Sequence, residues 1–377
     1  MAAPPPALME ELVEESLLRL PPDDPASLVR ASLVCKDWRR ILTGPGFRRR
    51  FRERHRTPPM LGFLRLRGSD RACCFTATSS FRPRNADLLH GRYALDSRHG
   101  RVLLTTMSMR QEPLESSLAI WDPITGDHMR LPQLPPRPQR RISCHAAVLC
   151  ASSPSGACNH LDCHRGPFLV VLMSTSRDEV FVDVYSSEAG AWSQPTFAGQ
   201  HPLDGPVWIV GVELGAFAGN ALHFMVLMDS GMGILKYNLN TREINQVNLP
   251  PNCRCSVELT TTEHGGLELA SMEDSRLHLW SMEDGPDGHL GWAQTRVIEL
   301  KNMLPANTRL FSVDCFVHSL AVVFTRTSEG LFSIDLNSAQ VRKAYEGRSF
   351  VNVVPFMSFY TPELGATSAG EGSSAGA

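Results

Sequence analysis

The chain lacks the features that mark several large classes of protein. Its 377 residues contain no run of about 18 consecutive apolar residues, so the sequence predicts no membrane-spanning helix. The N-terminus has neither the basic start nor the continuous apolar stretch of a secretory signal, and no Asn-x-Ser/Thr acceptor occurs. The ten cysteines are therefore expected to be reduced thiols, in a protein of the cytoplasm, the nucleus or both.

Familiar catalytic motifs are also missing. There is no Gly-x-Ser-x-Gly, no His-Glu-x-x-His and no obvious serine or cysteine triad. The formal charge is only −2, and no stacking aromatics accompany the basic residues, so neither nucleic acid nor a membrane is an expected partner. These absences predict a non-enzymatic protein without a cofactor.

Length and composition indicate two globular domains. An apolar content of 42% is ordinary for a globular protein, and 377 residues exceed the usual size of one compact core. The period of the apolar residues changes near Met60, which places the boundary there.

The first 56 residues predict a small module of three helices. Leu8, Leu12, Val13, Leu17 and Leu20 recur at helical spacing, and the prolines from position 21 end this first helix. Asp24 can cap a second helix with Pro25 at its first position. Val34, Cys35 and Trp38 give a third apolar face before the Gly-Pro-Gly of residues 44–46.

This segment resembles the F-box, whose helices tie an adaptor to a cullin-type ubiquitin ligase through a Skp-class linker protein. The resemblance rests on the Leu-rich helix that ends in Leu-Arg-Leu-Pro and on Val-Cys-Lys-Asp-Trp-Arg at 34–39. Met9 departs from the usual proline, and Ser16 stands where an apolar residue is typical. The plainer alternative is a three-helix cap on a larger domain. The resemblance implies linker docking by Leu8, Met9, Leu12, Val13, Leu17, Leu20, Pro21, Val34, Cys35 and Trp38, although some of these must instead hold the helices together.

Residues 30–56 carry ten basic and two acidic side chains. A nuclear-import or phosphate-binding patch is one interpretation. The favoured one is a solvated face of the last helix, with Phe47 and Phe51 turned inward at a spacing of four residues.

From Met60 onward the sequence predicts an all-β domain. Short apolar runs alternate with polar turns, and one unit recurs in which a strand ends in a large residue before a polar turn and a short returning strand. The matched positions are Trp121, Tyr185, Tyr237, Trp280 and Ile334. A repeat near 50 residues predicts a kelch-like β-propeller with five full blades and a sixth that joins the first strands, at 61–66 and 73–78, to the last, at 351–359. A pair of β-sandwiches is the alternative.

The later segments resemble the repeat-bearing domains of plant F-box proteins, especially a grass-type group. The likeness lies in Asp-Ser-Arg-His-Gly-Arg-Val-Leu-Leu at 96–104, Trp-Asp-Pro-Ile-Thr-Gly at 121–126, Ile-Glu-Leu-Lys at 298–301 and the stretch 354–362. The expected organisation is a disordered 1–7, a helical domain at 8–56, a linker at 57–60, the propeller at 61–360 and a disordered tail at 361–377. The overall class is thus α+β and multidomain.

One group of residues suggests metal chemistry. Cys144, His145, Cys150, Cys158, His160, Cys163 and His164 lie within 21 residues and offer thiolates and imidazoles, the ligands that zinc prefers. Their spacing matches no familiar zinc finger, so the favoured interpretation is a solvated hairpin loop without metal. A zinc-binding propeller enzyme is the weakest of the functional hypotheses.

The leading hypothesis is a substrate-recognition adaptor of a Skp–cullin–F-box ubiquitin ligase. The helices would bind the linker and, through it, the cullin and RING subunits, while propeller loops bind a target protein. The sequence does not identify the target or the residues that bind it. A non-degradative scaffold is the second hypothesis, because Met9 and Ser16 could weaken docking.

Overall fold

The computed structural model describes residues 9–67, 72–106, 118–136, 141, 143–153, 158, 160, 163–176, 179–198, 207–208, 214–251, 253, 256–262, 264–284, 290–305, 308–347 and 353–362. Leu8 and the predicted disorder at 1–7 and 363–377 lie outside these residues. Thr361, which the sequence places in the disordered tail, is buried. The ordered chain therefore continues past the expected boundary.

The N-terminal module contains four helices where the sequence predicts three. They are α1 (Glu10–Leu17), α2 (Pro25–Ser32), α3 (Lys36–Thr43) and α4 (Pro45–His55). Gly44 has an extended backbone and serves both as the C-cap of α3 and as the N-cap of α4, with Pro45 at the first helical position. The Gly-Pro-Gly segment thus ends α3 and begins α4, because proline is well tolerated in the first turn of a helix.

The helix starts differ in how they are capped. At α2, the Asp24 side chain accepts a hydrogen bond from the Ala26 N–H at 3.2 Å, as its place before Pro25 predicts. At α3, the Cys35 sulfur accepts from the Trp38 N–H at 3.5 Å. Met9, which precedes α1, makes no side-chain capping hydrogen bond. Glu10 and Glu11 in the first turn interact favourably with the positive end of the helix dipole.

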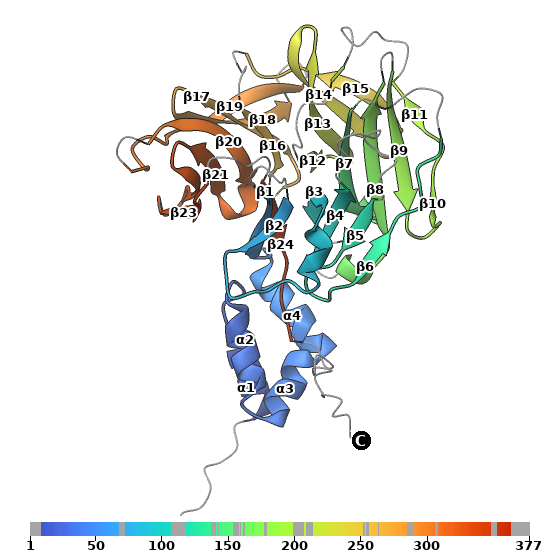
Figure 1. Cartoon of the computed structure of the whole chain (residues 1–377). Coiled ribbons are helices and arrows are strands. Elements are labelled where there is room, and N and C mark those ends of the chain that lie inside the picture. Colours follow the sequence, from blue (N-terminus) through green and yellow to red (C-terminus); the bar gives the residue numbers. More distant parts are fainter. Residues whose placement is uncertain are drawn as a thin grey trace, which may run out of the picture.

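The rest of the described chain is a six-bladed β-propeller, which confirms the predicted fold and rules out the sandwich pair (Figure 1). Blade 1 contains β3 (Arg92–Arg98), β4 (Arg101–Thr106), β5 (Ala119–Trp121) and β6 (His128–Arg130). Blade 2 contains β7 (Ser143–Cys150), β8 (Phe168–Thr175), β9 (Val180–Ser186) and β10 (Ala191–Trp192), and β11 (Thr196–Phe197) also pairs with β9.

The next three blades have four antiparallel strands each. Blade 3 contains β12 (Ala216–Ala218), β13 (Ala221–Met228), β14 (Gly231–Asn238) and β15 (Ile244–Val247). Blade 4 contains β16 (Val257–Thr261), β17 (Leu267–Glu273), β18 (Arg276–Asp284) and β19 (Leu290–Glu299). Blade 5 contains β20 (Leu310–Val317), β21 (Val322–Thr327), β22 (Gly330–Asp335) and β23 (Val341–Tyr345). Short 3₁₀ turns are η1 (Ala86–Leu89), η3 (Cys163–Arg165) and η4 (His318–Leu320).

Blade 6 joins the two ends of the domain, as the sequence predicts. It contains β1 (Met60–Arg67) and β2 (Ala72–Ala77) from the start and β24 (Val353–Met357) from the end, in the order β2-β1-β24. Phe63 of β1 faces Pro355 of β24 in an antiparallel register. Because radial repetition leaves only short edges, this pairing closes the ring.

The sequence repeat corresponds to one position in the third strand of five blades. Trp121, Tyr185, Tyr237, Trp280 and Ile334 lie on β5, β9, β14, β18 and β22. The turn that follows is built by a side chain in three of these blades: Asp122, Asn238 and Asp335 each accept hydrogen bonds from two backbone N–H groups, at 2.8–3.2 Å. Such Asx turns explain why Asp or Asn recurs at this point of the repeat.

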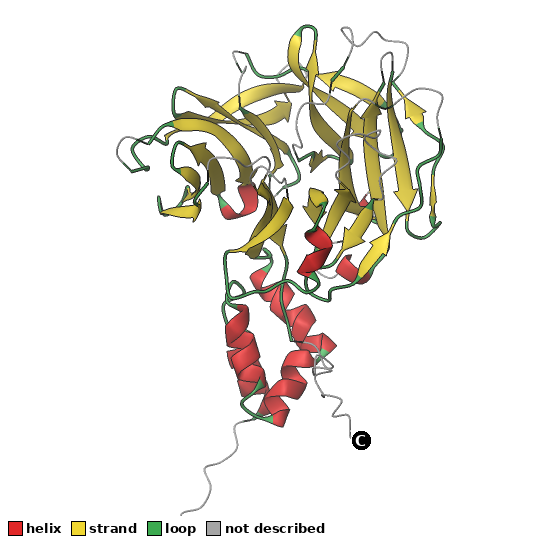
Figure 2. Cartoon of the chain, viewed as in Figure 1, coloured by secondary structure: helices red, strands yellow, loops and turns green. Residues whose placement is uncertain are grey.

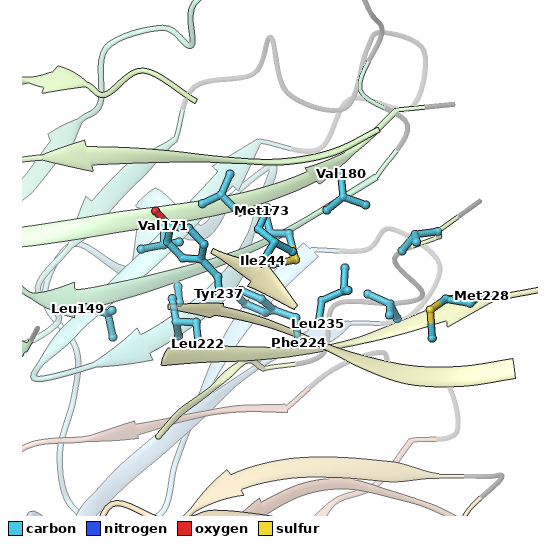
Figure 3. Close-up of a cluster of buried hydrophobic side chains, with 14 residues drawn as sticks. Leu149, Val171, Met173, Val180, Leu222, Phe224, Met228, Leu235, Tyr237 and Ile244 are labelled. Atoms are coloured by element: carbon cyan, nitrogen blue, oxygen red, sulfur yellow. The ribbon is translucent and has the colours of Figure 1, made fainter. Parts of the chain in front are cut away.

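The core lies between neighbouring blades. In Figure 3, Val171 and Met173 of blade 2 pack against Leu222, Phe224 and Tyr237 of blade 3, all of them buried. Polar bonds also link the innermost strands: the Asp96 carboxylate accepts from the Val148 N–H at 2.8 Å. These contacts hold neighbouring blades together. The helical module projects from one side of the ring (Figure 2).

Candidate functional site

Exposed apolar side chains gather on the helical module. Five of them lie on α1 and α2, at the caps of these helices and in the turn before α3, and their exposed fractions range from 36% to 76%. We call this set the distal face: Met9, Leu12, Val29, Leu33 and Val34. An isolated exposed leucine is common on protein surfaces, but five exposed apolar side chains on one small module make a candidate contact surface.

The name reflects the direction in which the helices run. The start of α2 lies next to the propeller, because the Ala26 N–H donates to Ser80 Oγ at 3.0 Å. The end of α1 lies near the end of α4, because the Leu18 carbonyl contacts His55 Nε2 at 3.0 Å. The first residues of α1 and the last of α2 are therefore at the opposite end of the module, away from the ring (Figure 1).

The predicted docking residues divide into two groups. Met9, Leu12 and Val34 belong to the distal face, and Pro21 and Cys35 are exposed as well, Cys35 as the cap of α3. Val13 and Leu17 are buried at 8% and 3% exposure, inside the module's own core. Leu20 and Trp38 are half-buried against the same core. Val13 and Leu17 thus hold the helices together and are not available to a partner in this arrangement.

Sequence reasoning missed Val29 and Leu33 as candidates for docking. Leu33 is the most exposed of the large apolar side chains in the described part of the chain, at 76%. The sequence signal that could have identified Leu33 is the apolar pair Leu33-Val34 directly after α2. These two residues lie beyond the apolar stripe of α2, which buries Leu28 and Ala31.

The two departures from the F-box pattern both lie on the surface. Met9 is 64% exposed, and Ser16 is exposed with its hydroxyl donating to the Leu12 carbonyl at 2.8 Å. A serine that bonds back to the preceding turn leaves the helix intact. Both residues therefore alter what a partner would meet and leave the core of the module unchanged.

The acidic side chains of α1 largely pair with basic side chains of the same module. Glu10 pairs with Arg40 at 2.9 Å, Glu14 pairs with Arg50, and Glu15 contacts both Arg19 and Arg54. Phe47 and Phe51 on α4 are buried, as the helical spacing predicts. Acidic α1 is thus matched to basic α3 and α4, although exposed pairs of this kind add little stability.

The proximal end of the module is covered by the propeller. Phe359, two residues after β24, belongs to the same buried cluster as Leu28 and Leu42, and its ring meets that of Phe51 edge-on at 6.2 Å between centroids. Ser358 donates its N–H to the Pro59 carbonyl at 3.2 Å. The end of the propeller chain therefore completes the core that the helices leave open on this side.

The cysteine and histidine group is only partly brought together. The ligand atoms of Cys150, Cys158, His160 and Cys163 all lie within 4.8 Å of one another. His145 is elsewhere: its Nε2 contacts the Met225 carbonyl of blade 3 at 2.9 Å. Cys144 packs on the other face of the strand, against the apolar cluster between blades 1 and 2. His164 is next to Cys163 but outside the four-residue group. Cys144, His145 and His164 are therefore removed from the predicted metal-binding set.

A small pocket of about 270 Å³ lies between blades 2 and 3 and is lined in part by Trp192, Tyr237 and Arg242. This volume is close to the lower limit of about 300 Å³ for small-molecule sites. Within the described part of the chain, no helix is both long and apolar enough to span a bilayer.

Comparison with known proteins agrees with these observations. A family model described as F-box domain matches residues 8–50. A second, described as F-box protein AT5G49610-like, beta-propeller, matches residues 93–364. No curated protein matches the chain.

The following solved structures are distantly similar to the chain. The nidogen–laminin complex is 10% identical with a TM-score of 0.41, covering 80% of this chain and 97% of that one. A protein of unknown function from Desulfotomaculum acetoxidans DSM 771 is 11% identical with a TM-score of 0.35, covering 79% and 89%. A chain from a study of two prolyl endopeptidases is 14% identical with a TM-score of 0.32; 66% of the present chain matches only 33% of that chain.

The propeller model alone spans well over half of the sequence, and the helical match precedes it in the same order as in the structure. The chain therefore belongs to the family of F-box proteins with an AT5G49610-like β-propeller.

Proposed function

We propose that the protein is a substrate-recognition adaptor of a Skp–cullin–F-box ubiquitin ligase. An F-box followed by a propeller is typical of non-catalytic adaptors, in which the F-box binds a Skp-class linker. In the proposed complex, the linker brings the cullin and RING subunits, and the propeller holds a target protein within reach of the ubiquitin-conjugating enzyme. Catalysis then follows from proximity and not from groups on this chain.

The observation that carries the proposal is the open distal face. Five apolar side chains remain exposed at the end of the module farthest from the propeller, whereas the proximal end is sealed by Phe359. Leaving such groups in water is unfavourable by roughly 25 cal/mol for each Å² of apolar surface, so a partner that covers them gains that energy. We infer that Met9, Leu12, Leu33 and Val34 are the main apolar contacts with the linker, with Val29 at the margin.

Co-purification with the linker protein tests this role. The double variant Leu12→Asp/Val34→Asp changes only exposed side chains and should lose the linker while keeping its thermal unfolding temperature. Leu290→Asp is the matched control, because Leu290 is 60% exposed on the propeller. Leu17→Asp is unsuitable, since Leu17 is buried and its loss would unfold the module. Unchanged linker binding by the double variant would refute the assignment.

The target is to be sought on the propeller. Affinity purification from cells with the cullin arm inactivated should retain the target, which normal turnover removes. A bound protein that accumulates when residues 9–56 are deleted would identify a degradation substrate. A bound protein whose level is indifferent to that deletion would favour a scaffold role.

A further inference from the structure

We propose that Cys150, Cys158, His160 and Cys163 form a structural zinc site that braces the junction between the propeller and the F-box module. Three thiols and one imidazole make one of the usual ligand sets for structural zinc. Their ligand atoms all lie within 4.8 Å of one another, the Cys163 sulfur is 3.6 Å from His160 Nδ1, and the Cys158 sulfur accepts from the His160 N–H at 3.3 Å.

The spacing of the four atoms is close to that of a metal-bound tetrahedron. With Zn–S bonds of about 2.3 Å, neighbouring sulfurs in a regular tetrahedron are about 3.8 Å apart. The observed group thus needs a contraction of about 1 Å at most between its atoms. Cys150 ends β7, and Cys163 begins η3, so two of the ligands are fixed by regular structure and the other two lie on the connection between them.

The backbone at His160 supports a built arrangement. Its φ is +58°, a left-handed conformation that few residues other than glycine adopt, and its ring stacks on that of His99 with 4.3 Å between centroids. Here the conformation places the ring of His160 next to Cys163.

The charges around the group suit a zinc–thiolate centre. Three thiolates with Zn²⁺ carry one net negative charge. Arg101 is buried at 4% exposure, interacts electrostatically with Cys163 and Cys150, and donates from Nη2 to the Cys163 carbonyl at 2.9 Å and to the Gly166 carbonyl. Its buried Nη1 has no hydrogen-bond partner among the described residues. Asp122 also interacts electrostatically with Arg101, and a thiolate centre would give this buried cation a second countercharge, in the way that outer partners tune metal ligands.

The position of the site explains what the metal would do. Arg52 of α4 is 5% exposed and interacts electrostatically with both Cys163 and Arg165. On the other side, the turn between β3 and β4 is tight against this segment: a Cβ at Gly100 would lie 3.2 Å from the Cβ of His164 and 3.3 Å from the hydroxyl of Ser358. The segment that carries the ligands therefore lies between α4 and the first blade. Closing it around a metal fixes the surface on which α4 rests.

The site is structural in kind. All four positions of a tetrahedral zinc would be filled by protein groups, and catalytic zinc keeps one position open for water or substrate. The proposal thus concerns how the module is held and leaves the proposed adaptor role independent of it.

Metal analysis of the full-length protein, purified with the linker if needed and without chelator, tests the site. We expect about one equivalent of zinc in the wild type and below about 0.2 in Cys158→Ser and Cys163→Ser. Cys253→Ser, a cysteine outside the group, is the matched control and should keep its zinc. Replacement by Co²⁺ should give the visible absorption of a tetrahedral thiolate complex. Zinc below about 0.2 equivalents in the wild type with no uptake of added zinc, or a disulfide between two of these cysteines, would overturn the proposal.

Hydrogen exchange tests the bracing role separately. Removing the metal should speed amide exchange in α4 and in residues 163–167, while β21 and β22 of blade 5, across the ring from blade 2, remain unchanged. If zinc is present but its removal leaves exchange in α4 unaltered, the junction role is wrong. Linker binding is the independent readout: loss of zinc without loss of linker binding leaves the adaptor proposal intact.

Discussion

Both ends of the F-box module carry large apolar side chains, but those at one end are buried and those at the other are exposed. At the proximal end, Phe47 and Phe51 are buried and Phe359 of the propeller completes their cluster. At the distal end, Leu33 and Val34 remain in water at 76% and 62% exposure. A module of fewer than about 50 residues cannot bury all its apolar side chains by itself. The comparison shows that, among the described residues, the propeller covers the apolar side chains of the proximal end, while those of the distal face remain exposed.

The largest expected effect removes the distal contacts. Leu12→Asp alone should weaken linker binding at least about 100-fold, since a charge would be buried in an apolar interface, with no change in unfolding temperature. Surface plasmon resonance with the purified linker measures the affinity. Leu290→Asp should bind like the wild type, and equal losses in both variants would contradict the contrast between the two regions.

The proximal end should respond in the opposite manner. Phe359→Ala removes a buried ring from the shared core and should lower the free energy of unfolding by about 3 kcal/mol, measured by urea denaturation. Phe311→Ala is the matched control, because Phe311 is 57% exposed, and it should be nearly neutral. A stability loss no greater than that of the control would show that Phe359 does not seal this end.

Acid should act on the propeller. Burial, with Lys236 nearby, lowers the pKa of His223 on β13 to about 4. Between that value and the ordinary pKa of about 6.5, the unfolded chain binds the extra proton, so stability is full above about pH 6.5 and is lost as the pH falls towards 4. Between about pH 7 and about pH 5 the loss amounts to about 2 kcal/mol, because each pKa unit is worth about 1.4 kcal/mol.

Urea unfolding at about pH 7 and about pH 5 measures this slope. His223→Gln should make the slope shallower without abolishing it, since burial also lowers the pKa of His164 to about 4, whereas His128→Gln, at an exposed position on β6, should leave the slope unchanged. A slope equal in the two variants would remove His223 as its source. No histidine lies among the five residues of the distal face.

The smallest effect sharpens the distal face. Ser16→Ile restores an apolar group at an exposed position of α1 and should tighten linker binding about fivefold, worth about 1 kcal/mol. The same substitution at Ser338, on an exposed propeller turn, should leave the affinity unchanged. A weaker complex with Ser16→Ile would mean that the linker avoids this side of α1.

The sequence predicted the fold well because its signals are periodic. The recurring third strand with its Asx turn revealed the blades, and apolar strands at both ends of the domain revealed the closing blade. The count of helices was wrong because Gly44 and Pro45 are typical both of a helix end and of a helix start.

The site was predicted less completely. Helical spacing indicates that Val13 and Leu17 are apolar positions, but it does not tell which apolar face meets the chain's own core. That division depends on α3 and α4 and on Phe359, more than 300 residues away in sequence. In the same way, sequence spacing does not distinguish Cys150 and Cys163, whose sulfurs lie close together, from Cys144, which packs against the apolar cluster between blades 1 and 2.

The pairing of β1 with β24 has a consequence for synthesis. The ring and the seat of Phe359 can form only after nearly the whole chain has left the ribosome, whereas the helices of residues 10–55 emerge first. A truncated translation product would thus present its linker-binding helices without a settled orientation or a closed recognition domain. Completion of the last strand therefore fixes how the helical module is held against the propeller.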